Sequence, residues 1–284
     1  MIVADGAEEL LARAGLGTVG RVLLCMGDHV VAWSRSTDTV RVGPETGNGE
    51  QTLYVKRYHV PKWSRRLRSI TAGRDRARRE YDQLRSLQQR GLPVVRALAT
   101  GARRRWGTLR SCFLITEGFD ASKSLDQWAT GQSGPAVERR ALITAVARAL
   151  SALHAAGVIH GQLFRRNVLV RREPSGRYDV RFLDFAPSAK RGRCGGQAAG
   201  DLGALGSGAK AFCSRTDMTR FLRAYLGSRR LSGAARELMR EAARIGERFE
   251  TSEQRRSRMA RLFEETRPGV SSTSAVHTAM SEEP

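Results

Sequence analysis

The sequence lacks the clustered cysteines that mark metal centres and disulfide frameworks. Its four cysteines, Cys25, Cys112, Cys194 and Cys213, lie far apart, without a Cys-x-x-Cys pair or a neighbouring histidine cluster. Zinc sites and small disulfide-rich folds both need closer spacing. We therefore expect reduced and mostly buried thiols.

A long uncharged hydrophobic run is lacking as well. The most apolar stretch, residues 141–159, contains Arg148 and His154 and repeats its apolar residues at helical spacing. This pattern predicts a buried core helix rather than a membrane span. The first residues carry acids and no basic segment followed by an apolar run, so we expect no secretion signal and a cytoplasmic location.

Acidic residues are few, since 28 Asp and Glu stand against 49 Lys and Arg and leave a net charge of +21. Such a field attracts polyanions, including nucleotide phosphates, anionic lipid headgroups, phosphorylated glycolipids and nucleic acid. A high-GC genome that favours arginine codons would produce the same excess, so charge alone does not choose among them. Nucleic acid is not expected, because no recognition motif or row of interleaved aromatic residues accompanies the charge.

The first part of the chain predicts a small antiparallel sheet with one helix. Residues 1–28 predict a helical extension. The five strand patterns that follow are His29–Trp33, Thr39–Val42, Leu53–Tyr58, Ala97–Thr100 and Cys112–Thr116. The helix lies between the third and fourth strands and ends near Gly91, before Pro93. Residues 29–117 thus predict a small lobe, with Arg103–Arg105 as the turn between the last two strands.

Residues 118–268 predict a second and mainly helical lobe. A helix near residues 137–156 places its apolar residues on one face, and a two-stranded hairpin follows between residues 168 and 183. Residues 201–267 are expected to be helical with basic faces. The tail, residues 269–284, is rich in Ser and Thr and is predicted to be disordered. The chain as a whole predicts an α+β fold of two lobes.

Two residues of the first lobe predict an ion pair. Lys56 ends an apolar strand pattern, and Glu80 lies on the apolar face of the following helix. Either residue alone is more often a surface residue. A carboxylate on an apolar helix face needs a partner, because burying an unpaired charge is costly, and Lys56 is the natural candidate. A lysine placed in this way is typical of the residue that contacts the α- and β-phosphates of ATP.

Two further motifs flank the predicted hairpin. Residues His160–Asn167 keep the spacing of the catalytic loop H-R-D-L-x-x-x-N, with His, Leu and Asn in place, and Leu183–Ala186 resembles a D-F-G site. Asn167 and Asp184 then supply oxygen ligands at the two ends of the hairpin. Together with phosphate oxygens, such ligands suit Mg²⁺. The ordered set of features predicts a site for ATP and Mg²⁺.

A literal match to the phosphate-covering motif G-x-G-x-x-G-x-V occurs at Gly15–Val22. A true phosphate-covering loop lies between the first two strands, shortly before the strand lysine, so we interpret this match as a structural turn at the start of a helix. The turn Ser34–Thr37 is the better candidate, because its backbone NH groups, its hydroxyls and Arg35 can meet phosphates.

Taken together, these motifs resemble the lipopolysaccharide-core (heptose/Kdo) kinase family, a divergent branch of the protein-kinase-like fold. The residues that carry the resemblance are Tyr54–Tyr58, Arg79–Tyr81, Gly91–Pro93, His160–Asn167, Leu183–Phe185, Asp201–Leu205 and Arg220–Leu226. The resemblance implies a five-stranded N-lobe sheet with one helix and a mainly helical C-lobe. It implies ATP and Mg²⁺ as cofactors, Glu117 as a further ATP contact, and a monomer. The implied acceptor is a sugar hydroxyl of the lipopolysaccharide inner core or of a related anionic glycolipid.

The resemblance also assigns the catalytic loop, where His160, Gln162 and Asn167 are the candidate catalytic residues. The family has an aspartate where this chain has Gln162, and a neutral amide cannot take the proton of an acceptor hydroxyl. A positioned general base contributes on the order of 10²–10⁴ in rate, but phosphoryl transfer depends mostly on positioning and charge. Two hypotheses remain open, an active phosphotransferase and a pseudokinase that binds nucleotide and regulates or scaffolds. Arg165 or Arg166 could replace the loop lysine of Ser/Thr kinases, whose place Phe164 holds.

The basic segment Lys62–Arg68 intersperses Trp63 and Leu67 among its cations. This mixture is typical of contact with an anionic membrane surface, and a solvated basic loop is the alternative. The first interpretation would place the protein peripherally on the inner face of the cytoplasmic membrane.

Overall fold

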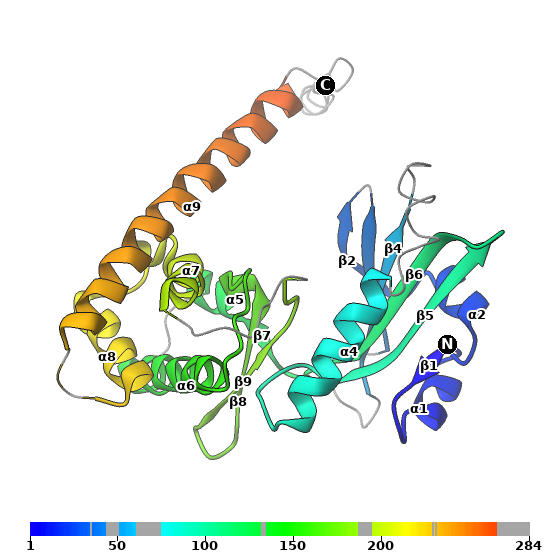
Figure 1. Ribbon diagram of the computed structural model, residues 1–284, viewed down its shortest axis with the longest axis horizontal. Coiled ribbons are helices and arrows are strands. Elements are labelled where there is room, and N and C mark those ends of the chain that lie inside the picture. The colour runs from blue at the N-terminus through cyan, green and yellow to red at the C-terminus, as the bar shows by residue number, and fades with distance from the viewer. Residues whose placement is uncertain are drawn as a thin grey trace, which may run out of the picture.

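Two lobes of different architecture make up the chain, one built on a sheet and the other mainly of helices (Figure 1). The computed structural model describes residues 1–34, 36–43, 51–60, 75–131, 135–186, 195–228, 230 and 232–265, with side chains described as far as residue 251. Arg35, the segment Lys62–Arg68 and the tail 269–284 lie outside the described residues, so the expectations that fall on them stay predictions.

The N-lobe sheet contains all five expected strands and one more. Its strands are β1 (Ile2–Val3), β2 (His29–Ser34), β3 (Thr37–Val42), β4 (Leu53–His59), β5 (Ala97–Arg105) and β6 (Thr108–Glu117). They lie in the order β1-β5-β6-β4-β3-β2, and every neighbouring pair is antiparallel. The added strand β1 comes from the predicted helical extension. The predicted turn at Arg103–Arg105 is wrong, because these arginines continue β5 and the chain reverses at Trp106 and Gly107.

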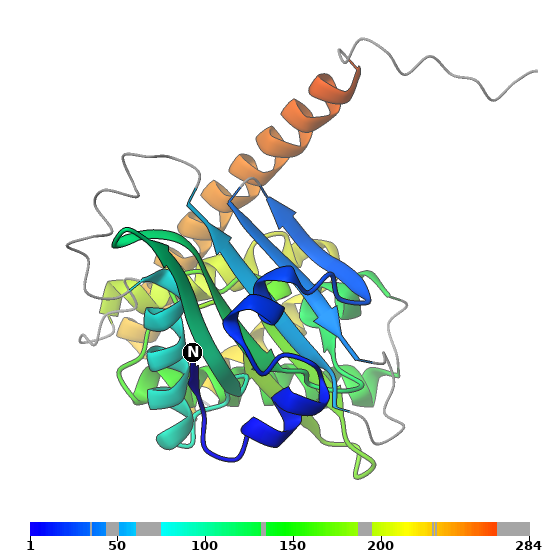
Figure 2. The ribbon, with the colours of Figure 1, turned by 90° about the vertical axis from the view of Figure 1, so that its right-hand side faces the viewer.

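Helices cover both faces of this sheet (Figure 2). Helix α4 (Arg76–Gln89) is capped by Asp75, whose side chain accepts a hydrogen bond from the backbone N–H of Arg78, and it buries an apolar face in a core that includes C-lobe residues. Helices α1 (Glu8–Arg13) and α2 (Val19–Leu24) pack on the opposite face. Thr18 caps α2, so the glycine-rich stretch before it is a structural turn at a helix start, as interpreted from the sequence.

Over its described residues the C-lobe combines five α-helices with a three-stranded sheet. The helices are α5 (Leu125–Thr130), α6 (Ala136–Ala155), α7 (Gly195–Gly206), α8 (Arg215–Leu226) and α9 (Gly233–Glu265), and the sheet joins β7 (Lys123–Ser124), β8 (Val168–Arg172) and β9 (Tyr178–Phe182). Short 3₁₀ turns occur at Arg165–Asn167 and Ala209–Ala211. The predicted core helix is α6, and α9 extends well beyond the lobe (Figure 1). None of the helices in the described ranges combines the length and apolar character needed to cross a membrane.

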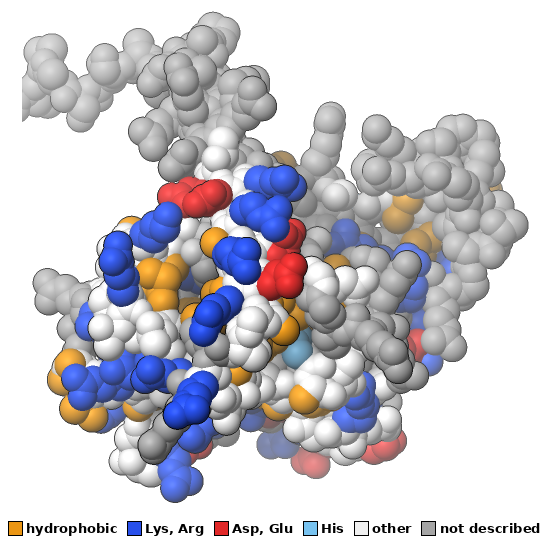
Figure 3. Space-filling model, turned by 60° about the vertical axis from the view of Figure 1, so that its left-hand side comes forward, with side chains coloured by type: hydrophobic (Ala, Val, Ile, Leu, Met, Phe, Trp, Pro, Cys, Tyr) orange, Lys and Arg blue, Asp and Glu red, His pale blue; other side chains and the backbone are white. Residues whose placement is uncertain are grey.

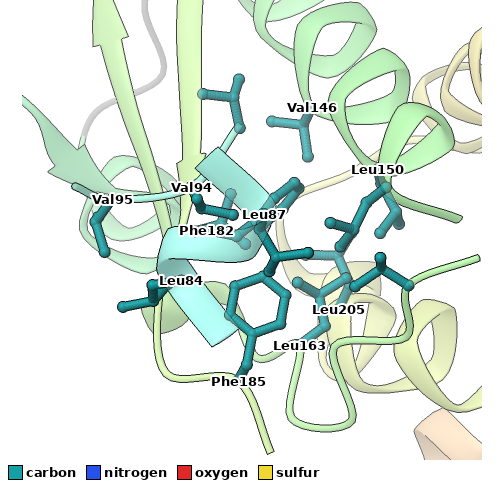
Figure 4. Close-up of a cluster of buried hydrophobic side chains, with 14 of the residues drawn as sticks. Leu84, Leu87, Val94, Val95, Val146, Leu150, Leu163, Phe182, Phe185 and Leu205 are labelled. Carbon is teal, nitrogen blue, oxygen red and sulfur yellow. The ribbon is translucent and has the colours of Figure 1, made fainter. Parts of the chain in front are cut away.

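One apolar core connects the lobes. Leu84 and Leu87 of α4 meet Phe182 and Phe185, which lie at the end of β9 and just beyond it, and the core continues to α6 (Figure 4). The linker between α4 and β5 is fixed to β9 by backbone hydrogen bonds, 3.1 Å from the N–H of Val95 to the carbonyl of Phe182 and 2.9 Å from the N–H of Phe182 to that of Pro93. The position of α4 is therefore set by the C-lobe.

A second core ties the N-terminal helices to the sheet. Leu11 of α1 is fully buried in it, whereas Leu24 at the end of α2 is 78% exposed. Of the cysteines in the described part of the chain, Cys112 is buried and Cys25 and Cys213 are half-buried, and all three are free thiols.

The substitution Leu11→Ala is expected to lower the free energy of unfolding by about 2–5 kcal/mol, because it removes buried contacts and leaves a cavity. The control Leu24→Ala should change it by less than about 0.5 kcal/mol, since that side chain is already in water. Urea unfolding followed by circular dichroism measures both. Equal losses for the two variants would contradict the packing of α1 on the sheet.

Candidate active site

Lys56 lies at the centre of the site and contacts carboxylates of both lobes. Its Nζ is 3.0 Å from Oε1 and 3.4 Å from Oε2 of Glu80, and 2.6 Å from Oδ1 of Asp184. The side chain of Lys56 is 20% exposed, that of Glu80 10% and that of Asp184 33%. The predicted pairing of Lys56 with Glu80 is confirmed. The contact with Asp184 was not predicted, and it joins the strand of one lobe to the hairpin end of the other.

Tyr58 is a further member of the site that sequence reasoning missed. Its hydroxyl donates a hydrogen bond to Oε2 of Glu80, and its ring is buried below α4. Burial and the neighbouring Glu80 carboxylate raise the pKa of Tyr58 far above its ordinary value, so the hydroxyl stays protonated. The sequence does contain a signal for Tyr58, because residues two apart on a strand share a face and Tyr58 follows Lys56 by two positions.

The segment after β9 holds Asp184 in an unusual conformation. Its φ is +61°, a left-handed region that residues with a side chain rarely adopt. This turn directs the carboxylate of Asp184 toward Lys56 while the ring of Phe185 enters the core under α4 (Figure 4). Backbone hydrogen bonds hold the segment on both sides, from Leu183 to Asn167 at 3.1 Å and from Ala186 to His160 at 2.9 Å.

His160 is fully buried and uses both ring nitrogens inside the protein. Nε2 lies 2.9 Å from the carbonyl oxygen of Leu183, and Nδ1 accepts from the backbone N–H of Gln162 at 3.3 Å. These partners assign a neutral ring protonated at Nε2, and burial lowers the pKa of His160 in the same direction. The ring stacks on Phe185 at 4.3 Å between centroids. His160 therefore positions the loop, and any part in catalysis passes through that positioning.

Asp201 of α7 anchors the same loop. Its carboxylate is almost fully buried and accepts from the backbone N–H of His160 at 2.7 Å and of Gly161 at 2.8 Å. Nε2 of His154 lies 3.1 Å from its Oδ2, and the hydroxyl of Tyr225 lies 2.7 Å from Nδ1 of His154. In the sequence Asp201 was only part of a family motif. Nothing local in the chain indicates that its two oxygens would meet a loop forty residues away.

A glycine is required within this loop. Gly161 has φ +78°, and a Cβ there would approach the Cβ of Ala186 to 2.7 Å. Any larger residue would separate the loop from the segment that carries Asp184.

The ends of the hairpin offer the oxygen ligands that Mg²⁺ prefers. Nδ2 of Asn167 donates to the carbonyl oxygen of Gln162 at 2.9 Å, so the acceptor that its amide can still offer is Oδ1, and the carboxylate of Asp184 is one-third exposed. No cluster of three or more His, Cys, Asp or Glu able to bind a metal occurs within the described ranges. Mg²⁺ usually keeps several waters and takes phosphate oxygens, so one amide and one carboxylate fit it. Gln162, in the same loop as Asn167, is exposed.

Two further predicted ATP contacts are Glu117 and the turn Ser34–Thr37. Glu117 commits its carboxylate to Gln51 and to Arg96, and its backbone N–H donates to the carbonyl oxygen of Arg96 at 2.9 Å. The turn between β2 and β3 is closed by Ser34, whose Oγ accepts from the N–H of Thr37 at 3.1 Å.

The two arginines of the catalytic loop also differ. Arg165 is taken up by Asp126 at 2.9 Å and by the carbonyl of Ser207, which leaves it unsuited to replace a loop lysine. Arg166 stacks on the ring of Phe164 at 4.5 Å and is exposed.

A separate apolar cavity of about 240 Å³ lies between the C-lobe helices, away from Lys56. Its lining includes Leu142 and Val146 of α6, Leu202 of α7, Phe221 of α8 and Met239 of α9. Figure 3 shows hydrophobic side chains in a hollow of this lobe with Lys and Arg side chains around them.

Comparison with known proteins gives a family and a fold. The model of the lipopolysaccharide kinase (Kdo/WaaP) family matches residues 31–225. A solved structure described as WaaP in complex with acyl carrier protein matches with a TM-score of 0.60 and 21% sequence identity, over 86% of this chain and 98% of that chain. No curated protein sequence matches closely enough to count as a relative. The structural likeness concerns the fold, and the expected two-lobed protein-kinase-like α+β fold is confirmed.

The substitution Asp201→Asn is expected to lower the free energy of unfolding by about 3 kcal/mol, because an amide cannot accept from two backbone N–H groups and His154 at once. The matched control is Asp179→Asn, whose carboxylate is 30% exposed beside Arg171 and Arg181 and should contribute less than about 1 kcal/mol. Urea unfolding measures the loss. Hydrogen exchange should also become faster at the amides of His160 and Gly161 in the first variant, and unchanged exchange there would contradict the anchoring role.

Proposed function

The chain belongs to the lipopolysaccharide kinase (Kdo/WaaP) family, and from this premise we propose that it transfers the terminal phosphate of ATP to a sugar hydroxyl of the lipopolysaccharide inner core or of a related glycolipid. The observation that carries the proposal is the amine of Lys56, held between Glu80 and Asp184. In kinases a lysine paired in this way contacts the nucleotide phosphates. Because the acceptor is a glycolipid, the reaction belongs at the cytoplasmic face of the membrane.

Each residue of the site has a distinct part in this proposal. Glu80 and the Tyr58 hydroxyl fix the amine of Lys56, which then offers its charge to the α- and β-phosphates. Oδ1 of Asn167 and the carboxylate of Asp184 would hold Mg²⁺, which neutralises charge on the phosphates when bound. The buried ring of His160 and the carboxylate of Asp201 keep the loop in place.

Gln162 is left to position the acceptor. Its exposed amide can accept a hydrogen bond from a sugar hydroxyl through the carbonyl oxygen, but it cannot remove the proton. The proton would leave with the transferred phosphate or go to water. Transfer through a loose transition state tolerates this loss at a lower rate, because positioning and charge supply most of the acceleration.

A pseudokinase is the second candidate, and the observation that favours it is the same residue. Lys56, Glu80, Asn167 and Asp184, which would bind nucleotide and metal, are present, while the aspartate base is replaced by Gln162. In that function the protein binds Mg·ATP without turnover and acts as a regulatory or scaffolding module.

Substitution of Gln162 by Asp tests the two functions. We expect wild-type protein to transfer labelled phosphate from Mg·ATP to purified core lipopolysaccharide slowly, and Gln162→Asp to raise the rate by about 10²–10⁴, the contribution of a positioned base. Lys56→Met should abolish transfer, and Lys123→Met, at an exposed lysine, should leave it unchanged. Binding of a fluorescent ATP analogue is measured on the same samples.

The results separate the candidates. Tight Mg·ATP binding with transfer only after Gln162→Asp would establish the pseudokinase and exclude the enzyme. Absence of nucleotide binding, or binding that Lys56→Met leaves intact, would contradict both functions.

An acyl carrier protein is a candidate partner, since the matched WaaP structure is a complex with one. The apolar cavity of the C-lobe supports this idea for the present chain, because its lining of Leu, Val, Phe and Met side chains suits an acyl chain. Arg139 and Lys210 also line it, but each is paired with an acid of the same lining, Arg139 with Asp217 at 3.5 Å and Lys210 with Glu247 at 3.8 Å, so the support comes from the apolar side chains alone.

Filling this cavity is expected to weaken binding of acylated carrier protein at least tenfold, because an indole ring takes the space of the chain. The variant is Met239→Trp, and the control is Arg236→Trp on an exposed position of the same helix. Surface plasmon resonance with carrier protein bearing or lacking an acyl chain measures the effect. Equal binding of the two carrier forms to wild-type protein would contradict the assignment.

A further inference from the structure

The ribbon formed by β5 and β6 projects from the N-lobe on the side away from the C-lobe (Figure 1). Residues 97–116, which make up nearly all of it, contain four arginines and no Asp or Glu. Three of the arginines, Arg103, Arg104 and Arg105, are consecutive at the tip and exposed. The tip is therefore a concentrated positive charge on a narrow projection.

The turn at the tip holds a residue that its geometry does not favour. Arg105 pairs with Thr108, and the two residues between them have positive φ, +50° at Trp106 and +72° at Gly107. A two-residue turn of this kind prefers Asn, Asp or Gly at both positions, because other side chains are strained there. Trp106 is therefore unfavourable for the backbone.

Trp106 is also unfavourable for its side chain. The indole is 83% exposed, the highest exposure among the large hydrophobic side chains of the described residues. The guanidinium of Arg105 lies over one face of the ring, 4.5 Å from its centroid. A tryptophan that strains the turn and stays this exposed gains little from burial, and its position at the centre of a cationic tip points to contact with another surface.

We propose that this tip, Arg103 to Gly107, docks the protein on an anionic lipid bilayer, with Trp106 at the headgroup level and the three arginines on lipid phosphates. An exposed tryptophan surrounded by cations is complementary to the interface of such a membrane, where indole rings and arginines both concentrate. The ribbon offers one aromatic ring at a convex tip and no row of rings, which fits insertion into an interface rather than stacking along a nucleic acid.

Docking by this tip is a property separate from phosphate transfer. It requires neither ATP nor Gln162, so it is measured on vesicles without any turnover. Failure of the proposed kinase activity therefore leaves this inference standing, and failure of docking leaves the kinase site intact.

The experiment measures co-sedimentation of the full chain with vesicles of phosphatidylcholine containing phosphatidylglycerol, and with vesicles of phosphatidylcholine alone. Wild-type protein is expected to bind the anionic vesicles and to lose affinity as salt is raised. The triple variant Arg103→Gln, Arg104→Gln, Arg105→Gln should weaken binding about a hundredfold, at roughly fivefold for each arginine. Trp106→Asn should weaken it about tenfold while keeping or raising the thermal unfolding temperature, because Asn suits the turn.

Two matched variants control for general charge and general aromatic exposure. Arg177→Gln removes an exposed arginine from the β8–β9 hairpin, and Trp33→Asn removes an indole that is 78% exposed on β2. Both should bind vesicles as wild-type protein does. Brominated lipids should quench the emission of wild-type protein and lose this effect in Trp106→Asn.

Four outcomes would overturn the proposal. They are equal binding to both kinds of vesicle, unchanged binding of the tip variants, losses in the control variants as large as those at the tip, and an equal loss of affinity of the tip variants for a single-stranded oligonucleotide. The last result would identify a general polyanion surface.

Discussion

The site depends on one amine shared by two carboxylates that belong to different lobes. Glu80 reaches Lys56 from α4, and Asp184 reaches it from the end of the C-lobe hairpin. The three charged groups therefore come into contact only when the lobes are packed together. The cluster carries one net negative charge when all three groups are ionised. The cluster therefore attracts a cation such as Mg²⁺. The contact between Lys56 and Asp184 would weaken if the carboxylate of Asp184 became a metal ligand. A partly buried cluster of this kind is weak as a source of stability, but it specifies the arrangement of its members.

Everything around Asp184 serves to keep its carboxylate in this place. The left-handed backbone turns the side chain toward Lys56, and Phe185 secures that turn by entering the core beneath α4. His160 packs on Phe185 and bonds to Leu183, and Asp201 holds the backbone of His160 from behind. The order of dependence thus runs from a buried carboxylate in α7 to the amine on β4. Residues of both lobes form the apolar core beneath Asp184. The contact between Lys56 and Asp184 therefore depends on apolar packing between the lobes.

The sequence predicts those parts of the site whose signals are local. The ion pair of Lys56 with Glu80 follows from two periodic elements and the cost of burying a lone carboxylate. The contact of Lys56 with Asp184 spans 128 residues and depends on how two lobes pack, which no periodicity records. Strand β1 was missed because two residues are too short for an alternating pattern, and its pairing with β5 is decided by the packing of α1. The Arg103–Arg105 run was misread as a turn, because strand ends that project beyond the core have no buried face to reveal their period.

Gln162 differs from the other residues of the site, because it is exposed whereas they are buried or strained. The buried acid of Glu80, the strained backbone of Asp184 and the enclosed ring of His160 are all costly, and each is compensated only by the others. Apolar residues in place of the whole ion-paired set would often cost no stability, whereas removal of one partner alone would leave a buried charge uncompensated. Gln162 lies exposed, makes no demand on the core, and can change to aspartate without disturbing its neighbours. In the proposed function, nucleotide binding and acceptor activation would therefore be physically separable, because the first would depend on the packing of both lobes and the second on one exposed side chain.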